Sequence, residues 1–140
     1  MHLKVKKLTD TATLPRYAHP GDVGLDLYSQ EEYTVQPGEV HIFYLGFALE
    51  FPSGYAAIVK DKSSVGSKGV VTVGGVFDAG YRGEYNVGLA NFTNTPFPVA
   101  KNQKIAQLVI FPVVIADLEE VTELSQSARG TGGFGSTGKF

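Results

Sequence analysis

The 140-residue chain contains no cysteine, and its apolar stretches are short. The absence of cysteine excludes a disulfide framework and any catalytic or metal site built on a thiolate. The longest apolar stretches fall far short of the roughly 20 residues that a membrane-spanning helix needs, so we expect no membrane partner. The length is that of one domain, which can bury a core without covalent staples.

An excess of charge of one sign is also lacking. Twelve lysines and arginines face fourteen aspartates and glutamates, which gives a net charge of -2 at pH 7. This balance creates no strong field toward DNA, RNA or anionic lipid, so we expect no nucleic-acid partner. The opening residues, MHLKVKKLTD, lack the apolar core of a signal peptide, and we therefore expect a cytoplasmic location.

Signatures of several common catalytic sites are missing as well. His2, His19 and His41 are far apart and show no HxH or HxxxH spacing, which argues against a zinc site. The chain has neither the GxSxG elbow of serine hydrolases nor the GxxxxGK[ST] loop of nucleotide-binding proteins.

Glycine and proline are plentiful, with 17 and 7 residues, and they interrupt short apolar runs. These runs alternate with period two or form blocks, which favours an all-β fold of the sandwich, distorted-barrel or jelly-roll type. Residues 115–124 and the stretch KSSVGSK from Lys62 are each compatible with one helical turn, the second capped by a serine. The expected strands cover residues 3–8, 33–36, 39–51, 55–60, 69–73, 84–92 and 104–114.

The end of the chain differs in composition from the rest. We predict a β domain over residues 1–124 and a glycine-rich arm over residues 125–140, because glycine makes the arm flexible unless it docks. The stretch RGTGGFGSTG from Arg129 combines a guanidinium, hydroxyls and glycine N–H groups, which bind anions, with a phenyl ring that can cover a flat ligand. The stretch therefore predicts a clasp for a phosphorylated ring compound, with a plain linker as the alternative.

Two aspartates stand in unusual surroundings. Asp26 lies between Leu25 and Leu27, so it either points to water, which this segment alone favours, or has a charged partner. Asp78 follows Phe77 in VGGVFDAGYRGEY, which we interpret as a glycine-rich hairpin whose main chain a ligand could approach. A plain hairpin with a polar tip is an equally good interpretation of that segment.

Two further segments carry polar groups suited to a ligand. The serines that follow Lys62 have N–H and hydroxyl groups beside ammonium groups, which suits phosphate, although a helix cap with surface lysines explains them better by itself. Gln107 lies in an otherwise apolar block and needs hydrogen-bond partners from a ligand, another chain or the core.

Five segments, taken together, resemble the five ordered motifs of the trimeric dUTP pyrophosphatases (dUTPases). They are PGDVGLDLYS, KDKSSVGSKG, GGVFDAGYRGE, KNQKIAQLVI and RGTGGFGSTG, and they extend along nearly the whole chain. The resemblance implies a jelly-roll homotrimer whose three active sites are each built from three subunits. It also implies Mg²⁺-dependent hydrolysis of dUTP to dUMP and pyrophosphate, which keeps uracil out of DNA and supplies dUMP for thymidylate synthesis.

The same resemblance implies a role for each matching residue. Asp78 would hold and activate the water that attacks the α-phosphorus, Asp26 would reach the metal through water, and Tyr81 would pack under the deoxyribose. Residues 72–78 would read the uracil edge with their main chain. The predicted substrate-binding residues are Lys62, Ser63, Ser64, Thr72, Val76, Phe77, Tyr81, Asn86, Gln107, Arg129, Phe134, Gly135, Ser136 and Thr137.

The chain departs from the family pattern at three places. The family usually has Pro-Arg where this chain has Asp61-Lys62, more often an acidic residue at Gly80, and commonly arginine at Lys104. Lysine keeps the charge but loses the planar fork of arginine, and Asp61 adds a negative charge near a triphosphate. The change to Asp61-Lys62 leaves a regulatory nucleotide-binding module without catalysis as one alternative. A relative of the dCTP deaminases, which share the fold, is the other, although the chain shows no clear match to their catalytic motif.

Overall fold

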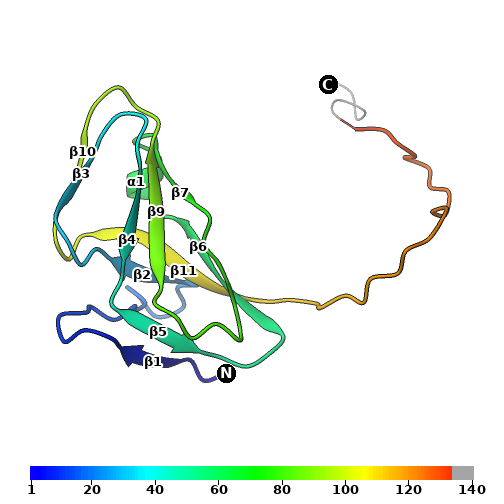
Figure 1. The fold of residues 1–140 in the computed structure, drawn as a ribbon, viewed down its shortest axis with the longest axis horizontal. Helices are drawn as coiled ribbons and strands as arrows, with labels where there is room; N and C mark the ends of the chain where they lie inside the picture. Colours follow the sequence, from blue (N-terminus) through cyan, green and yellow to red (C-terminus); the bar gives the residue numbers. More distant parts are fainter. Residues whose placement is uncertain (134–140) are drawn as a thin grey trace.

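The computed structural model describes residues 1–133, which form strands, loops and one short helix (Figure 1). This confirms the all-β prediction. The helix α1 spans Ser63–Gly66. The strands are β1 (Lys4–Lys7), β2 (Gly24–Tyr28), β3 (Tyr33–Val35), β4 (Val40–Tyr44), β5 (Phe47–Glu50), β6 (Tyr55–Asp61), β7 (Val70–Val73), β8 (Val76–Asp78), β9 (Asn86–Asn91), β10 (Phe97–Val99) and β11 (Lys104–Pro112).

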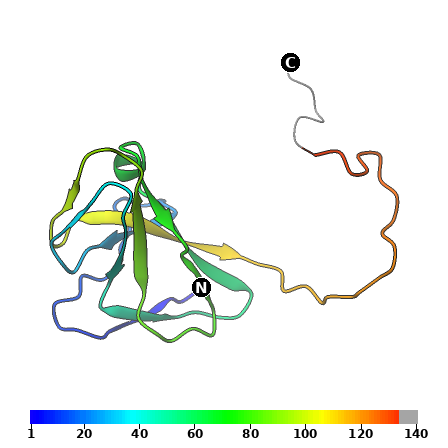
Figure 2. The same ribbon diagram turned by 45° about the horizontal axis from the view of Figure 1, so that its top comes forward.

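The strands form two main antiparallel sheets and two short ribbons. One sheet has the order β2-β11-β6-β8, and the other has the order β4-β9-β7. The ribbons pair β1 with β5 and β10 with β3. Figures 1 and 2 show these pieces wrapped around one interior. The apolar side chains of both sheets meet in that interior.

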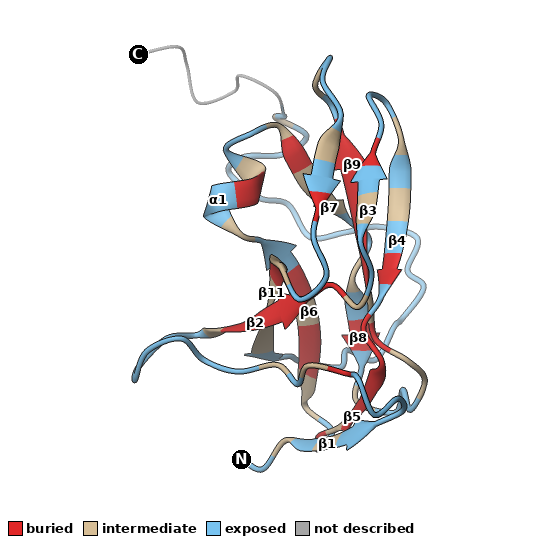
Figure 3. Cartoon of the chain, turned by 90° about the vertical axis from the view of Figure 1, so that its left-hand side faces the viewer, coloured by how far each residue is buried: buried red, intermediate tan, exposed pale blue. Residues whose placement is uncertain are grey.

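The core consists of the apolar side chains that the strands direct inward. In Figure 3 the buried positions follow β9, β5 and the neighbouring strands β6 and β11, while α1 and the loops are largely exposed. Strand β9 lies between β4 and β7 and is buried from Val87 to Asn91, while β11 lies between β2 and β6 and buries Ile105, Ala106 and Leu108. The largest fully buried side chains are Tyr85, Phe43, Phe47, Leu27, Leu45, Leu49, Leu89, Ile105 and Leu108.

Residues 39–51, predicted as one strand, are divided into β4 and β5. The division lies at Gly46, where φ is +70° and a side chain would lie 2.7 Å from the Thr9 hydroxyl. This conformation favours glycine and lets the chain leave the sheet of β4 for the ribbon with β1. The sequence prediction missed β2, β8 and β10, which have only three to five residues each.

The segment around Asp78 is not the hairpin that we predicted. Strand β7 pairs with β9 in one sheet, and β8 pairs with β6 in the other. The turn between them consists of Gly74 and Gly75, with φ values of +70° and +90°. The segment from Val70 to Asp78 therefore connects the two main sheets. Its glycines adopt the positive φ values that this crossing requires.

The two predicted helical turns have different outcomes. The stretch after Lys62 forms α1, but Lys62 and not a serine occupies the N-cap position. Residues 115–124, all of them described, form no helix. Their exposed apolar side chains have no neighbouring element to cover them, and an isolated helix of this length is marginal in water. The helix prediction for residues 115–124 is therefore wrong.

The chain leaves the β domain after β11. Residues from Val113 to Gly133 run away from the domain in both Figure 1 and Figure 2. Large apolar side chains are exposed along this stretch, with Val114 93% and Leu118 97% accessible. The division into units at residues 124 and 125 stays a prediction. Over residues 1–133, the structure contains no helix of the length and apolar character needed to cross a membrane.

Candidate active site

Asp26 lies in β2 and is buried, with 5% of its surface accessible. Lys62 Nζ donates a hydrogen bond to its Oδ1 at 3.1 Å, and Lys104 Nζ lies 2.6 Å from its Oδ2. The charged-partner interpretation is therefore correct, and the interpretation that Asp26 points to water is wrong. Sheet pairing supplies the partners, because β11 lies beside β2 and Lys62 follows β6 on the other side of β11.

Two opposing effects act on the Asp26 carboxyl. Burial works to raise its pKa, but hydrogen bonds and charges from Lys104 and Lys62 outweigh burial and leave the pKa below the ordinary value of 3.8. Asp26 also raises the pKa of Lys104 through the same contact. The three side chains therefore form an ion triad in which the Asp26 carboxylate stays ionised at neutral pH.

The lowered pKa predicts an acid-dependent contribution of Asp26 to stability. The unfolded chain has the ordinary Asp26 pKa of 3.8, so it takes up this proton at a higher pH than the folded chain does. The stabilisation by the triad is therefore complete at pH values well above 3.8 and is lost as the pH falls through the lower folded-state pKa. We expect Asp26→Asn to flatten this part of the curve of unfolding free energy against pH. Urea denaturation from neutral pH down to below that value measures it. Equal slopes for the wild type and the variant would contradict the triad.

A cavity of about 330 Å³ opens beside the triad. Asp26, Lys62 and Gln107 line it together with His19 and Asp22. The structure thus brings together residues from three of the predicted motifs, because Gln107 pairs with Asp26 on one side and with Lys60 on the other. The Gln107 side chain lies over Gly24, where a Cβ atom would be 2.2 Å from Gln107 Oε1. Glycine at this position makes room for the amide.

Two exposed serines follow Lys62 at the edge of this cavity. Ser63 and Ser64 begin α1, directly after Lys62, and both are exposed. Val65 is the buried residue that holds the turn against the core. Two hydroxyls beside an ammonium group are suited to bind phosphate oxygens. This part of the site therefore has the chemistry of an anion-binding surface.

Asp78 lies elsewhere, at the end of β8. Its side chain is exposed and lines a cavity of about 480 Å³ with Phe51, Tyr55 and Val113. Arg82 closes the following turn, since its Nη1 donates hydrogen bonds to the main-chain oxygens of Ala79 and Tyr81 at 2.7 and 3.0 Å. The carboxylate is therefore carried on a strand end and a braced turn, accessible to a ligand or water.

An aromatic cluster supports the turn after Asp78. Tyr81 packs against Phe77 and Tyr85 with ring centroids 5.5 and 5.9 Å away, and its hydroxyl donates to Glu84 O at 3.0 Å. Phe77 stacks on Tyr85 at 4.2 Å, and burial raises the pKa of Tyr85 to about 12. One face of Tyr81 is thus packed, while 39% of the residue stays accessible to a ligand.

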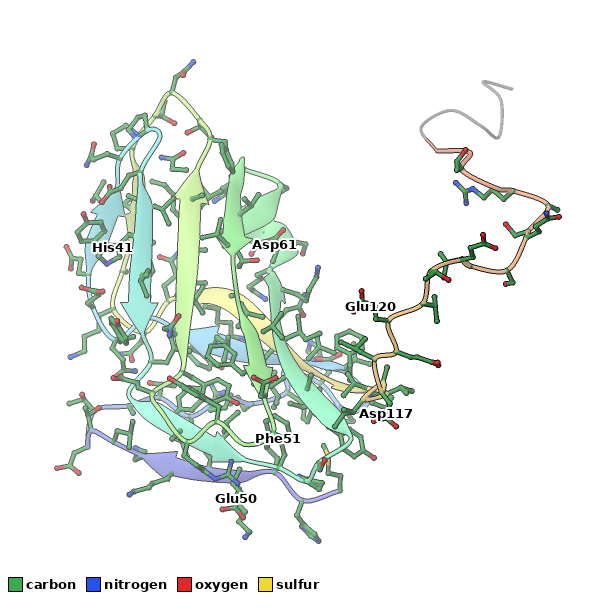
Figure 4. The ribbon with its side chains drawn as sticks, turned by 45° about the vertical axis from the view of Figure 1, so that its right-hand side comes forward. His41, Glu50, Phe51, Asp61, Asp117 and Glu120 are labelled. Carbon is green, nitrogen blue, oxygen red and sulfur yellow. The ribbon has the colours of Figure 1, made fainter. Side chains whose placement is uncertain are left out.

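The Asp26 and Asp78 cavities lie far apart within one chain. Asp26, Gln107 and Lys60 share one row across the sheet, whereas Asp78 lies opposite Ala56. Four residues along β6 and three strand spacings separate the two aspartates, which amounts to roughly 20 Å. Figure 4 marks the two ends of the domain, with Asp61 at the α1 end and Phe51, which lines the Asp78 cavity, at the other end. A single chain does not unite all the predicted residues.

The remaining predicted residues are dispersed. Thr72 in β7 hydrogen-bonds to Asp61, Val76 in β8 is 68% exposed, and Asn86 begins β9. Arg129 is exposed, and its Nε donates to Gly132 O at 2.9 Å. Phe134, Gly135, Ser136 and Thr137 lie outside the described residues.

Sequence reasoning missed Lys104 and Asp61 as parts of the site. Both were noted only as departures from the family pattern. Lys104 reaches Asp26 because β11 pairs with β2, with a register shift after Lys104 that sequence spacing does not reveal. Asp61 binds Thr72 and Gln107 across a turn and a strand pair. The sequence did offer one signal for both residues: each is a charged residue at the end of a strand that is otherwise rich in apolar residues.

The described carboxylates do not form a metal cage by themselves. Over residues 1–133 there is no group of three or more histidine, aspartate or glutamate side chains positioned to hold a metal ion. Mg²⁺ commonly keeps several waters and takes only one or two carboxylates beside the phosphates of its substrate. Asp26, on its cavity and already paired with two lysines, fits an indirect contact through water better than direct coordination.

Comparison with known proteins places this arrangement in a family. Residues 10–138 match the family model described as dUTPase. The chain is 47% identical to the deoxyuridine 5'-triphosphate nucleotidohydrolase of Clostridioides difficile, with 98% of each chain covered. It is 48% identical to the protein of the same name from Clostridium acetobutylicum, over 99% of this chain and 97% of the relative.

Solved structures agree with the sequence relatives. The dUTPase of Staphylococcus bacteriophage 80alpha with dUpNHpp superimposes with a TM-score of 0.91 at 30% identity, covering 98% of both chains. A mutant dUTPase from phage phi11 of S. aureus, reported for its coordination of a structural Mg(II) ion, gives 0.83 at 25% identity, over 90% of this chain and 100% of that one. With its family-model match, its relatives and its fold in agreement, this chain belongs to the dUTPase family.

Proposed function

We propose that this protein hydrolyses dUTP to dUMP and pyrophosphate, through Mg²⁺-assisted attack of water on the α-phosphorus. The membership in the dUTPase family and the names of its relatives support dUTP as the substrate. The reaction would take place in the cytoplasm, where it would keep uracil out of DNA and supply dUMP for thymidylate synthesis.

We propose that each active site is shared between the subunits of a homotrimer. The observation that carries this proposal is the separation of roughly 20 Å between Asp26 and Asp78, because a triphosphate binding at one cannot present its α-phosphorus to the other within one chain. Exposed apolar residues on β4, namely Val40, Ile42 and Tyr44, also leave surface for a neighbouring subunit.

In this assembly the Asp26 cavity of one chain receives the phosphates. Lys62, Ser63 and Ser64 supply a cation and two hydroxyls, and the free amide hydrogen of Gln107 adds a donor. When bound, Mg²⁺ would neutralise phosphate charge and stabilise the leaving pyrophosphate. Asp26 would orient water on the phosphate side. Its two lysines hold it ionised for that role.

The Asp78 cavity of a second chain receives the nucleoside and the attacking water. A carboxylate is a weak base at neutral pH, so Asp78 acts mainly by holding and aligning the water, while cations stabilise the developing charge. Tyr81 packs under the deoxyribose and leaves no room for a 2′-hydroxyl. The main chain from Thr72 to Asp78, including that of Val76 and Phe77, reads the uracil edge, and Asn86 contributes from the start of β9.

The arm from residue 125 closes the site of a neighbouring pair of chains. Arg129 binds the γ-phosphate, Phe134 covers the uracil, and Gly135, Ser136 and Thr137 contact phosphates. The segment from Val113 to Arg129, 16 residue steps long, can span about 55 Å when extended, enough to reach another subunit. Closure excludes water and strengthens the electrostatic interactions at the phosphates.

An activity screen tests this function. With purified protein and Mg²⁺, we expect pyrophosphate release from dUTP to exceed release from dCTP, dTTP and dATP by more than about a hundredfold in kcat/KM, because the uracil contacts reject other bases. Equal rates for all four nucleotides would refute the proposal. Ammonia release from dCTP would instead indicate a deaminase, and tight dUTP binding without turnover would indicate a regulatory module.

A further inference from the structure

Asp61, the last residue of β6, connects two parts of the candidate site. Its Oδ1 accepts hydrogen bonds from the Thr72 main-chain N–H at 2.6 Å and from Thr72 Oγ1 at 2.7 Å. Its main-chain oxygen accepts a hydrogen bond from Gln107 Nε2 at 2.9 Å. The next residue, Lys62, binds Asp26. One residue thus contacts the β7–β8 segment (Val70–Asp78) and the phosphate-side cavity.

The β7–β8 segment needs such an anchor because its own backbone is permissive. Gly74 and Gly75 form the turn between its strands, both with positive φ. The turn is held to β6 by the hydrogen bond from Val59 N to Gly75 O, at 2.8 Å. Thr72 lies before this turn, and Asp61 is its contact on β6. Bonds from neutral donors to a carboxylate are stronger than bonds between neutral groups, so this contact fixes the segment firmly.

We propose that Asp61 is a positioning residue for dUTP hydrolysis, holding the base- and sugar-reading segment in register with the phosphate-binding turn. The inference rests on the proposed function. It also explains how the chain accommodates a negative charge where the family usually has proline, since two donors of Thr72 occupy the carboxylate. Figure 4 shows Asp61 at the end of the domain that carries α1 and β7.

Variants of both partners test the proposal. Asp61→Ala removes the acceptor, Thr72→Val removes one donor, and Asp61→Asn keeps an acceptor oxygen without the charge. We expect Asp61→Ala to lower kcat/KM for dUTP between about tenfold and a hundredfold, mainly through KM, as small misplacements of a binding segment do. Asp61→Asn should recover most of the loss. Asp10→Ala, an exposed aspartate outside the site, is the matched control.

Hydrogen exchange provides a readout that does not depend on catalysis. In Asp61→Ala, the Thr72 amide should exchange more than about tenfold faster, because it loses its acceptor, while amides of the central strand β9 keep their protection. If Asp61→Ala lost protection throughout the domain, Thr72→Val would test the same contact with a smaller change. We expect Asp61→Ala and Thr72→Val together to lower kcat/KM no further than Asp61→Ala alone.

The outcomes separate this inference from the proposed function. A wild type that hydrolyses dUTP, with Asp61→Ala within about twofold of it, would overturn the positioning role alone, as would strictly additive losses in the double variant. A wild type that does not hydrolyse dUTP would overturn the proposed function. In that case an unchanged exchange rate of the Thr72 amide in Asp61→Ala would also refute the claim that Asp61 holds the β7–β8 segment through Thr72.

Discussion

Asp78→Asn is expected to lower kcat for dUTP about a thousandfold while the Kd for dUTP changes by less than about threefold. The amide keeps the size of the carboxylate but presents an NH₂ group and loses the charge that holds and orients the water. Because the side chain is exposed at the end of β8, the substitution removes no core contact. Single-turnover hydrolysis measures the chemical step, and calorimetry with a hydrolysis-resistant dUTP analogue measures binding.

A matched control variant tests whether the loss of activity is specific to position 78. Asp10→Asn makes the same chemical change at an exposed position in the loop after β1, and it should leave kcat, Kd and the melting temperature unchanged. Asp78→Asn should share that melting temperature, since surface substitutions away from special contacts change stability by about 0.5 kcal/mol or less. Wild-type turnover by Asp78→Asn would show that Asp78 has no part in the mechanism. It would also refute the proposal that the Asp78 cavity holds the attacking water.

Most of the regular strands could be predicted from alternation and turn residues, because their side chains face a core on one side and solvent on the other. The short strands β2 and β8 could not, since a glycine stands at or just before the start of each and each carries an aspartate that looks out of place. The burial of Asp26 depends on Lys62 and Lys104, which only the pairing of β2, β11 and β6 brings to it.

The candidate site shows the same division between local and long-range information. Motif order identified the family, and the structure places Asp26, Lys62 and Gln107 on one cavity. The distance from that cavity to Asp78 follows from strand register, which no local pattern encodes. Asp61 is an instructive case, because its charge looked unfavourable for phosphate binding until the structure showed its contacts with Thr72.

Deleting residues 125–140 is expected to lower kcat more than about a hundredfold and to leave the assembled β domain intact. No described residue of this segment belongs to the core cluster, and all of them are exposed apart from the half-buried Gly132. Closure over the substrate, which excludes water and aligns the attack, would be lost. Gln126→Ala, a small change at an exposed arm position, is the control and should keep full turnover. Gel filtration and thermal unfolding report the assembly, and a truncated chain with full activity would refute the clasp.

Mixing two inactive chains tests whether the arm and Asp78 act from different subunits. The truncated chain still carries Asp78, and the Asp78→Asn chain still carries the arm. If each site takes these two parts from different chains, trimers refolded from a mixture will contain some sites with both parts intact, and activity will return to a sizeable fraction of wild type. If both parts come from one chain, every mixed trimer will stay inactive. Activity in the refolded mixture well above that of either chain refolded alone is the expected result, because the proposed function places the arm over a site whose Asp78 belongs to another chain.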